Sequence, residues 1–420
     1  MADERKGNGM KEIVSVIYHD CNKEARSMEM INCMRMLGHV HYVSYAAPAN
    51  IDDVVCHLID KSKVTALFDF LHMAKKTIIK VQPDIVFLHD NDCAILIPFI
   101  QKRVPKARII YDSSELYIDE IFGNGSRFRG NGFKIWVKQK LTAFRPKSEK
   151  KYLKNVDIVI AANTERAEKM KEYFELNSTP VVFDNIHRIN DTYDQTACDQ
   201  KFFGIVRRDK FNILFGGGID EERRTFDFIN DFLKLDNGYN LVIAGSASDI
   251  ARKKYEEMIS TADQSRIHYI GFISRAELRY LFRNCQASVV VFDTNSFNTL
   301  YCASGKCYES LFEGTTIIAS ENPPLKRLCT EEGVGISNDD FACGIQQMYT
   351  NYSEIKSAVT NFLVKINYEK RVEQLTDVLK NALLSSSEES SNSGKQTATL
   401  PELNIYRFRI ACLDLIINNL

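Results

Sequence analysis

Short apolar runs rich in β-branched residues recur along this chain, each followed by a longer stretch in which apolar residues have helical spacing. In the first half, the runs Ile13–Tyr18, Val40–Tyr45 and Ile85–Leu88 do not alternate apolar with polar residues. Strands without alternation are covered on both faces, which is typical of a parallel sheet with helices on either side. The pattern predicts an α/β fold built on parallel sheets.

The second half repeats this scheme after a polar stretch around residues 188–208. Apolar strands are expected at Asn212–Phe215, Asn240–Ala244, Ile267–Ile270, Ala287–Phe292 and Thr315–Ala319, with helices between them. A chain of 420 residues is also long for a single core. We therefore expect two Rossmann-like, doubly wound parallel-sheet domains facing each other across a cleft, the first over residues 1–190 and the second over residues 191–365.

Three further segments complete the expected organisation. A long helix is predicted from about Asp53 to Val81, and another over residues 366–384 that returns to the N-terminal domain. The Ser-rich run that follows has nothing to bury, so residues 385–399 are expected to be a disordered linker. Residues 400–420 are apolar enough to dock as a tail.

Composition excludes several classes of protein. A net charge of −1 argues against a protein that binds nucleic acid. The 11 cysteines are odd in number and form no Cys-x-x-Cys pair, which favours reduced thiols in the cytoplasm over a disulfide framework. The polar stretch Met1–Lys6 does not resemble a signal peptide, and apolar runs such as Cys93–Ile100 are too short to span a membrane. We expect a cytoplasmic protein.

One basic segment suggests where such a protein could contact a membrane. Between Arg127 and Lys154 there are ten Lys or Arg residues and one acid, interleaved with apolar residues such as Trp136. A basic amphipathic helix can lie on the anionic inner face of a membrane. A domain-surface helix with a solvated basic face is the alternative interpretation.

The strongest local motif comes late in the chain, at Ser304-Gly305-Lys306. A turn of small residues opens a predicted helix over Ser304–Glu313, capped by Ser304 and closed by Gly314, so that free backbone N–H groups and a positive dipole end face any bound phosphate. Lys306 adds a charge there, and Glu309 lies one turn further on, where a carboxylate can accept both hydroxyls of a ribose. A plain capped surface helix with a Lys-Glu pair is the alternative.

A glycine-rich turn follows the first strand of the second half. Gly216-Gly217-Gly218 lets a ligand approach the backbone, and Arg223 and Arg224 follow it at a distance that could clamp a diphosphate. Gly245 ends the next strand in the same way. The spacing does not fit the dinucleotide-binding fingerprint, and a tight turn before a helix with exposed arginines would produce the same residues.

In the first half, polar clusters follow two predicted strands. Asp90 comes after one strand, and Ser114 and Glu115 come after the next, so all three should line the same cleft unless they serve only as turn residues. His39 and His41 lie two apart on a strand and share a face, but no further carboxylate or cysteine stands at ligand spacing. We expect no metal site.

Taken together, these segments resemble the family 4 (group 1) glycosyltransferases of the GT-B fold. The resemblance extends from about Ile13 to Leu383 and is carried by the order and spacing of several short motifs. These are Gln82–Asp90, the stretch Ala107–Tyr117 with its Tyr-Asp-Ser-Ser-Glu-Leu turn, the strand Val156–Asn163, Leu241–Gly245 and Ile267–Phe272.

The resemblance implies a retaining transfer of a hexose-type sugar from a nucleotide diphosphate sugar to a glycan or lipid-linked acceptor, without an essential metal or other cofactor. By position, Arg223 or Arg224 would stabilise the leaving diphosphate and Glu309 would hold the ribose. The remaining donor-binding residues would be Gly217, Gly218, Gly245, Ser304, Gly305 and Lys306, and the acceptor side would be formed by Asp90, Ser114 and Glu115.

Three departures from the family pattern keep other functions open. Ser114 replaces the family's histidine, Tyr301 stands where the first glutamate of its motif would be, and Gly218 takes the place of an earlier basic residue. A nucleotide-sugar-binding protein that has lost catalysis is one alternative. A nucleotide-sugar epimerase on the same fold is another, and a scaffold held through residues 400–420 is a third.

Overall fold

The computed structural model describes residues 10–63, 66–116, 118, 149–260 and 264–390, without the side chains of 385–390. Residues up to Leu379 form one compact unit and the chain from Lys380 onward a second. Most of the basic segment 127–154, the predicted linker beyond Ser390 and the predicted tail 400–420 lie outside the described residues. The membrane-contact and tail predictions are therefore not examined by the structure.

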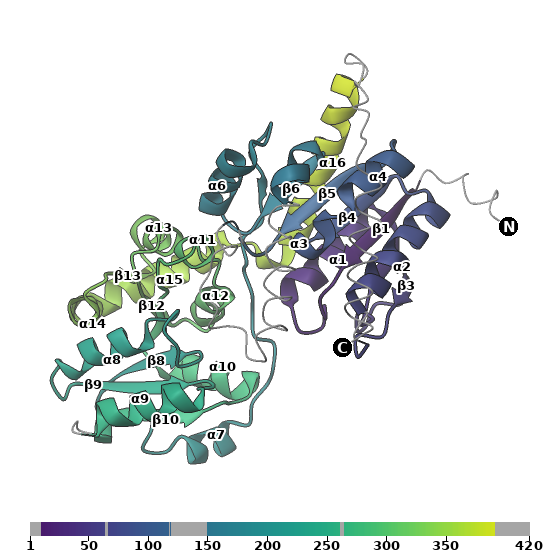
Figure 1. Ribbon diagram of the computed structural model, residues 1–420. Helices are drawn as coiled ribbons and strands as arrows, with labels where there is room; N and C mark the ends of the chain where they lie inside the picture. Colours follow the sequence, from purple (N-terminus) through teal and green to yellow (C-terminus); the bar gives the residue numbers. More distant parts are fainter. Residues whose placement is uncertain (1–9, 64–65, 117, 119–148, 261–263, 391–420) are drawn as a thin grey trace. The chain divides into compact units, whose positions relative to one another are not determined.

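The first half folds around a seven-stranded sheet in which every pair of neighbouring strands is parallel (Figure 1). The strand order is β3-β2-β1-β4-β5-β6-β7. The strands are β1 (Lys11–Ile17), β2 (Gly38–Ser44), β3 (Val54–Leu58), β4 (Ile85–His89), β5 (Arg108–Ser113), β6 (Ile158–Ala161) and β7 (Val181–Val182). All five residues of β4 are buried, as expected of an apolar strand without alternation.

Helices cover both faces of this sheet because each helix carries one apolar stripe. The helices of this half are α1 (Ala25–Leu37), α2 (Ala66–Val81), α3 (Asn91–Ala94), α4 (Ile97–Arg103) and α6 (Thr164–Phe174). One core contains Val14 and Val16 of β1 together with Phe70 of α2, Ile100 of α4 and Met170 of α6. α1 packs against β1 and β2, and the start of the C-terminal helix described below contacts α1.

The predicted long helix from Asp53 to Val81 is wrong in its first part. Residues Val54–Leu58 form the edge strand β3, and the helix α2 begins only at Ala66. β3 pairs in parallel with β2, from Val40 opposite Val54 to Ser44 opposite Leu58. The sequence Val-Val-Cys-His-Leu is short and rich in β-branched residues, so sheet pairing outweighs its weak helical spacing.

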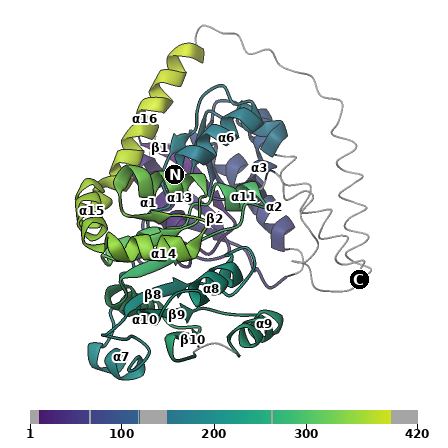
Figure 2. The ribbon, with the colours of Figure 1, turned by 90° about the vertical axis from the view of Figure 1, so that its left-hand side faces the viewer.

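The second half folds around a six-stranded parallel sheet of order β10-β9-β8-β11-β12-β13. Figure 2 shows its strands β8, β9 and β10. Its strands are β8 (Phe211–Gly216), β9 (Tyr239–Ala244), β10 (Ile267–Gly271), β11 (Ala287–Val290), β12 (Thr316–Ala319) and β13 (Gly335–Ser337). The five predicted strands of this half are found within two residues of these positions, and β13 was not predicted.

The helices of the second half again lie on both faces. They are α7 (Gln195–Lys201), α8 (Thr225–Leu233), α9 (Asp249–Ile259), α10 (Arg275–Asn284), α11 (Phe297–Leu300), α12 (Gly305–Phe312), α13 (Pro323–Glu332), α14 (Phe341–Thr350) and α15 (Tyr352–Lys365). One core joins Phe215 of β8 with Phe228 of α8 and Phe341 of α14. On the opposite face, Val242 of β9 packs with Leu281 of α10.

The last helix, α16 (Arg371–Ser390), begins beside α1. Arg371 donates to Glu29 of α1, and the Thr376 hydroxyl lies 3.2 Å from the Cys33 sulfur of the same helix. The helix includes the first six residues of the predicted linker 385–399. The domain boundaries themselves stay a prediction.

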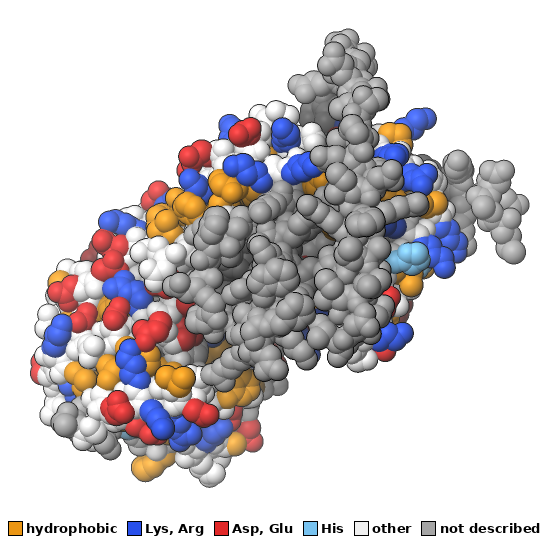
Figure 3. Space-filling view, viewed as in Figure 1, with side chains coloured by type: hydrophobic (Ala, Val, Ile, Leu, Met, Phe, Trp, Pro, Cys, Tyr) orange, Lys and Arg blue, Asp and Glu red, His pale blue; other side chains and the backbone are white. Residues whose placement is uncertain are grey.

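Charges of both signs are interspersed over the described surface drawn in Figure 3, with no large area of one sign. This agrees with the net charge of −1. Within the described part of the chain, no helix combines the length and apolar character needed to cross a membrane.

Each sheet has one place where the strand order reverses. In the first sheet it lies between β1 and β4, and in the second between β8 and β11. The connections leave these neighbouring strands in opposite directions, so a crevice opens at their carboxyl ends. These two places are where ligands are expected.

Candidate functional site

A pocket lies at the reversal point of the six-stranded sheet. It is lined by residues at or just beyond the ends of β8 and β11, together with three polar side chains from other segments. The polar side chains are Arg223, Ser304 and Lys306.

The two adjacent arginines have different surroundings. Arg223 lines the pocket, and its backbone N–H is bound by Asp220 at 2.8 Å. Arg224, at the start of α8, is paired instead with Asp339 and with Asp227. The prediction named both arginines, and the structure brings only Arg223 to the pocket.

Lys306 reaches the pocket from the first turn of α12. Its Nζ donates to the carbonyl oxygen of Gly216, at the end of β8, over 3.0 Å. Burial first, and then the charge of Arg223, lowers the pKa of Lys306 to about 8. A lysine held in this way is still charged at pH 7 but is close to titrating.

Ser304 precedes α12 but does not cap it. Its side chain accepts no hydrogen bond from the first turn of the helix, so the capping prediction is wrong. The hydroxyl lines the pocket instead. The first N–H groups of α12 therefore do not have this hydroxyl as a partner, and such groups favour an anion.

Glu309 lies one turn further along α12 and is almost entirely buried. Its carboxylate forms an ion pair of 3.1 Å with Arg275, the first residue of α10. Glu309 is not among the residues that line the pocket. Arg275 was missed by the sequence argument, because nothing in the local pattern distinguishes it from other helix-start arginines.

The glycines named from the sequence lie where a side chain would meet close neighbours, which are backbone atoms at Gly245 and Gly218 and a side chain at Gly305. A Cβ at Gly245 would lie 1.7 Å from the carbonyl oxygen of Gly217, so the loops after β8 and β9 can meet only if this residue is glycine. A Cβ at Gly218 would come within 3.2 Å of the Ser246 carbonyl oxygen. At Gly305 it would lie 2.3 Å from the His187 ring.

His187 was also missed by the sequence argument. It lies in the segment between the two sheets, against the start of α12, and its Nδ1 is buried with no hydrogen-bond partner among the described residues. Burial first, and then the charge of Arg371, lowers the pKa of His187 to about 4. The ring is therefore neutral at pH 7.

At the reversal point of the first sheet, the structure brings Asp90 and Ser114 together as predicted. The Ser114 backbone N–H donates to Asp90 over 2.8 Å, and its hydroxyl donates to Asp90 Oδ2 over 2.7 Å. Asp90 follows β4 with a φ of 58° and a ψ of 175°, a strained backbone conformation that is otherwise almost confined to glycine. His19, which follows β1, places Nε2 3.2 Å from the same Oδ2.

A buried ion network lies behind this pair. His89 Nδ1 is 2.9 Å from Asp112, and Arg26 binds the Asp112 carboxylate through two nitrogens. Burial alone lowers the pKa of His89, but the carboxylates around it, Asp90 above all, raise the pKa well above its ordinary value. The protonated ring has no lone pair to offer a metal ion, although His19, His89 and Asp90 lie close enough together to hold one.

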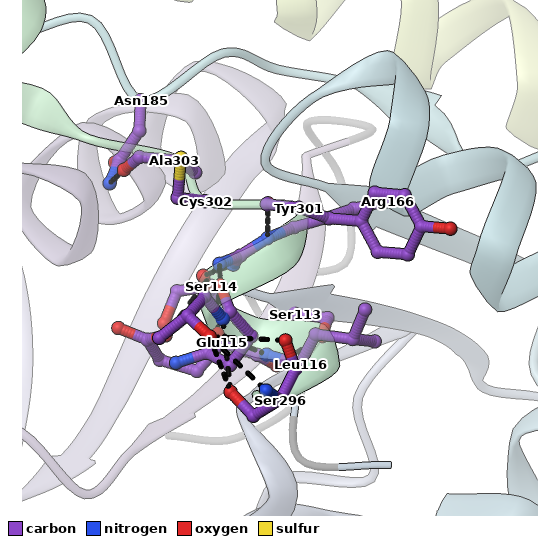
Figure 4. A network of polar contacts seen from close by, with 12 residues as sticks. Ser113, Ser114, Glu115, Leu116, Arg166, Asn185, Ser296, Tyr301, Cys302 and Ala303 are labelled. Carbon is purple, nitrogen blue, oxygen red and sulfur yellow. Dashed lines mark hydrogen bonds and ion pairs between the residues drawn. The ribbon is translucent and has the colours of Figure 1, made fainter. Parts of the chain in front are cut away.

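The turn after β5 is joined to the segment that precedes α12 (Figure 4). Arg166 of α6 is fully buried and donates to the Tyr301 carbonyl oxygen over 2.7 Å, to the Ser114 carbonyl oxygen, and to Asn298 Oδ1 over 2.8 Å. The Glu115 carboxylate is 3.8 Å from Arg166. Residues predicted for the acceptor side thus share one buried arginine with the chain that leads into the donor motif.

Solved structures of the same architecture are known. Sucrose-phosphate synthase from Thermosynechococcus elongatus is 14% identical, with a TM-score of 0.63 over 89% of this chain and 100% of that chain. HepE from Anabaena in complex with UDP is 10% identical, with a TM-score of 0.63 over 90% and 100%. A glycosyltransferase from Rickettsia africae is 13% identical, with a TM-score of 0.64 over 89% and 99%.

Two Rossmann-like parallel-sheet domains of this kind make up the GT-B fold of glycosyltransferases, and the predicted fold class is confirmed. At these low identities the likeness establishes the fold, and function has to be argued from the site. No protein-family model matches the chain, and no curated protein does.

Proposed function

We propose that the protein is a glycosyltransferase that moves a sugar from a nucleotide diphosphate sugar to a glycan or lipid-linked acceptor. The observation that carries the proposal is the convergence of Arg223, Lys306 and the start of α12 on one pocket at the reversal point of the C-terminal sheet. Two positive side chains and a helix N-terminus are suited to a diphosphate. The structures of HepE with UDP and with UDP-glucose support a ligand of this class.

The chemistry requires cleavage of the bond between the anomeric carbon and the diphosphate oxygen. Negative charge grows on the β-phosphate as this bond breaks. Arg223 and Lys306 stabilise that charge, and interactions of this kind are strongest in a closed site from which water is excluded. Loss of one such donor typically lowers the rate by about 10²–10³.

The remaining donor contacts are proposed from the resemblance to family 4. Glu309, which forms an ion pair with Arg275, holds the ribose hydroxyls, and Gly217 and Gly245 border the diphosphate. We propose retention of the anomeric configuration, in keeping with the resemblance to family 4. We also propose that transfer needs no metal ion, because Arg223 and Lys306 supply the positive charge that a metal would contribute.

On the acceptor side, Asp90, Ser114 and Glu115 line the strand ends, and an imidazole lies beside them. His19 and Ser114 share the same oxygen of Asp90, and the His19 side chain is 39% exposed. Burial works against its charge, but the hydrogen bond to Asp90 raises the pKa of His19 above its ordinary value. A ligand can therefore meet a histidine here even though Ser114 replaces the histidine of the family motif.

The proposal is tested first by binding. The purified chain is heated with UDP, GDP, ADP and their common sugar conjugates, and the unfolding temperature is recorded. A ligand at one hundred times its Kd stabilises by about 2.7 kcal/mol, which raises the unfolding temperature by a few degrees. If no nucleoside diphosphate produces a shift, the proposed function is wrong.

The neighbouring arginines provide a matched pair of variants. Arg223→Ala should lower transfer at least tenfold, whereas Arg224→Ala removes a surface ion pair worth about 0–1 kcal/mol and should retain most of the activity. Glu309→Ala should also lower transfer at least tenfold. Equal losses of activity in the two arginine variants would show that the assignment of Arg223 alone is incorrect. Separately, the anomeric configuration of the product shows whether transfer is retaining.

A nucleotide-sugar-binding protein without turnover is the second candidate. It is favoured by one observation, that the Ser114 hydroxyl is committed to Asp90 where the family motif has a histidine. This candidate predicts a thermal shift with a nucleotide sugar and no product with any acceptor. An epimerase would instead convert the donor with no acceptor present, so analysis of the donor after incubation alone identifies an epimerase, and product formation with an acceptor separates the other two functions.

A further inference from the structure

Four potential metal ligands gather at one edge of the seven-stranded sheet, away from the site described above. They are Glu12 of β1, His39 and His41 of β2, and His57 of β3. Three of the chain's eight histidines are therefore on two adjacent strands. Glu12 is paired in register with His39, and His41 lies two residues further on the same face of β2.

The ligand atoms of three of these residues nearly converge. Glu12 Oε2 is 3.0 Å from His39 Nδ1 and 3.5 Å from His41 Nε2. All three atoms lie within 4.8 Å of one another. Ligands at about 2.0–2.1 Å in tetrahedral geometry are separated from each other by roughly 3.4 Å, so small side-chain rotations bring these atoms onto one ion.

The chemistry of the set favours zinc. Two imidazoles and one glutamate, with water in the fourth position, form a known zinc coordination set. Nitrogen and oxygen ligands without sulfur fit this ion, whereas calcium and magnesium prefer oxygen alone. The side chains are also partly exposed, 18% for His41 and 39% for Glu12, so an ion can reach them from solvent.

His57 is not one of the three converging residues, but it contacts His41. Its Nε2 lies 3.1 Å from His41 Nδ1, the ring nitrogen that does not face Glu12. A hydrogen bond there fixes the tautomer of His41 and leaves the lone pair of Nε2 free for a metal. Partners of this kind orient metal-binding histidines in many sites.

The pKa values of His41 and His57 are shifted in the opposite direction to that of His89 in the buried network at the carboxyl ends of the strands. There, carboxylates keep His89 protonated. Here, burial lowers the pKa of His41 and of His57, and the nearby Lys80 acts in the same direction for both. Neutral imidazoles can bind a metal, and the Glu12 carboxylate offsets part of its charge.

We propose that Glu12, His39 and His41 bind one zinc ion, with His57 as the partner that orients His41. Glu12 and His39 lie near the amino ends of β1 and β2, whereas Asp90 and Ser114 follow the carboxyl ends of β4 and β5. The zinc is therefore not part of the transfer reaction. It joins β1 to β2 and stabilises this edge of the sheet.

Zinc titration of the chelator-treated, tag-free chain tests the proposal, with calorimetry in the presence of a competing chelator to measure affinity and stoichiometry. One ion per chain is expected. His41→Gln and Glu12→Gln should each weaken binding at least tenfold, and His57→Gln should weaken it about tenfold. The matched control is His72→Gln, which changes an exposed histidine on α2 and should leave the affinity unchanged.

X-ray absorption at the zinc edge identifies the ligands independently. Nitrogen and oxygen neighbours at about 2.0–2.2 Å are expected, with the imidazole contribution lost in His41→Gln. Sulfur neighbours at about 2.3 Å would place the ion on cysteines instead and overturn the proposal. Unchanged affinity in His41→Gln, with the unfolding temperature of the zinc-free variant equal to that of the native chain, would also overturn it.

Discussion

Lys306 illustrates how a single side chain depends on what surrounds it. In the sequence it is one of 54 basic residues, and only the small residues before it mark it as special. In the structure its ammonium group is held by a backbone carbonyl at the end of β8, beside Arg223. Burial and a neighbouring positive charge both favour its neutral form.

The lowered pKa of Lys306 makes nucleotide binding sensitive to alkaline pH. The group is charged below a pKa of about 8 and loses its proton above it, so affinity for a nucleoside diphosphate should fall as pH rises. Between pH 7 and pH 9 we expect the Kd of UDP to rise about tenfold, because the charged fraction of Lys306 falls by that factor. The diphosphate is already deprotonated above pH 7 and adds no titration of its own. Calorimetric titration at several pH values checks this.

Lys306→Met is the variant that isolates the effect. It should bind UDP more weakly at pH 7 and show no further loss between pH 7 and pH 9. If the variant keeps the native pH dependence of the Kd, a group other than Lys306 causes that dependence.

His187 should make the protein sensitive to acid. Its pKa is about 4 in the folded chain, against an ordinary value of 6.5. Below pH 6.5, His187 therefore binds a proton in the unfolded chain but stays neutral in the folded chain until the pH approaches 4. The contribution to stability is complete above pH 6.5 and is lost as pH falls toward 4, by up to about 3 kcal/mol.

Urea unfolding of the native chain and of His187→Asn between pH 4.5 and pH 7 measures this difference. The variant should lose less stability than the native chain as the pH is lowered. The exposed His72→Asn serves as control and should follow the native curve. Parallel curves for native chain and His187→Asn would contradict the assignment.

At the scale of elements, the donor site depends on how closely two loops approach. The N–H of Gly217 donates to the Ala244 carbonyl over 2.8 Å, and the N–H of Gly245 donates to the Gly271 carbonyl over the same distance. These bonds hold the ends of β8, β9 and β10 together. There is no room for a side chain between them.

Gly245→Ala should therefore displace the loop after β8 and weaken binding of UDP at least tenfold. An added Cβ would overlap the Gly217 carbonyl, at 1.7 Å, and backbone cannot move aside as a flexible side chain can. Calorimetry measures the affinity, and circular dichroism verifies that the fold persists.

Gly344→Ala on α14 is the matched control for this substitution. There a Cβ would meet the Asn338 side chain at 3.3 Å, and alanine in a helix gains roughly 0.5–1 kcal/mol over glycine. Affinity should be unchanged. Equal affinity of Gly245→Ala and native chain would show that the glycine contact does not shape the site.

At the scale of the whole unit up to Leu379, Arg166 joins chain segments that are more than a hundred residues apart. It belongs to α6 of the first sheet and binds carbonyl groups of Ser114, Asn298 and Tyr301. Removing a charged donor destabilises the folded state, because the buried carbonyl groups are left without a hydrogen-bond partner. A charge that is buried to this extent persists only because its partners are all in place.

Arg166→Met should lower stability by about 3 kcal/mol, since it leaves several buried carbonyl groups without their donor and removes the ion pair with Glu115. The midpoint of urea unfolding measures the loss. Lys171→Met on the same helix removes an exposed charge and should change stability by less than about 0.5 kcal/mol. Similar midpoints for the two variants would mean that the Arg166 contacts contribute little.

Sequence alone determined the features that depend on local chemistry. Apolar runs without alternation predicted both parallel sheets, and Gly217, Gly245 and Lys306 were identified from the residues that close turns and open helices. The edge strand β3 was missed because a short run at a sheet edge has little periodicity of its own. Its pairing with β2 decides its conformation.

Tertiary structure decided which distant charges meet. Nothing local distinguishes Arg223 from Arg224, yet one reaches the pocket and the other pairs with Asp339. His39 and His41 had no further ligand in the sequence, and the strand order brings Glu12 and His57 beside them. Spacing along the chain sets local conformation, whereas the order of strands in a sheet sets which side chains become neighbours, and that order is a property of the folded molecule.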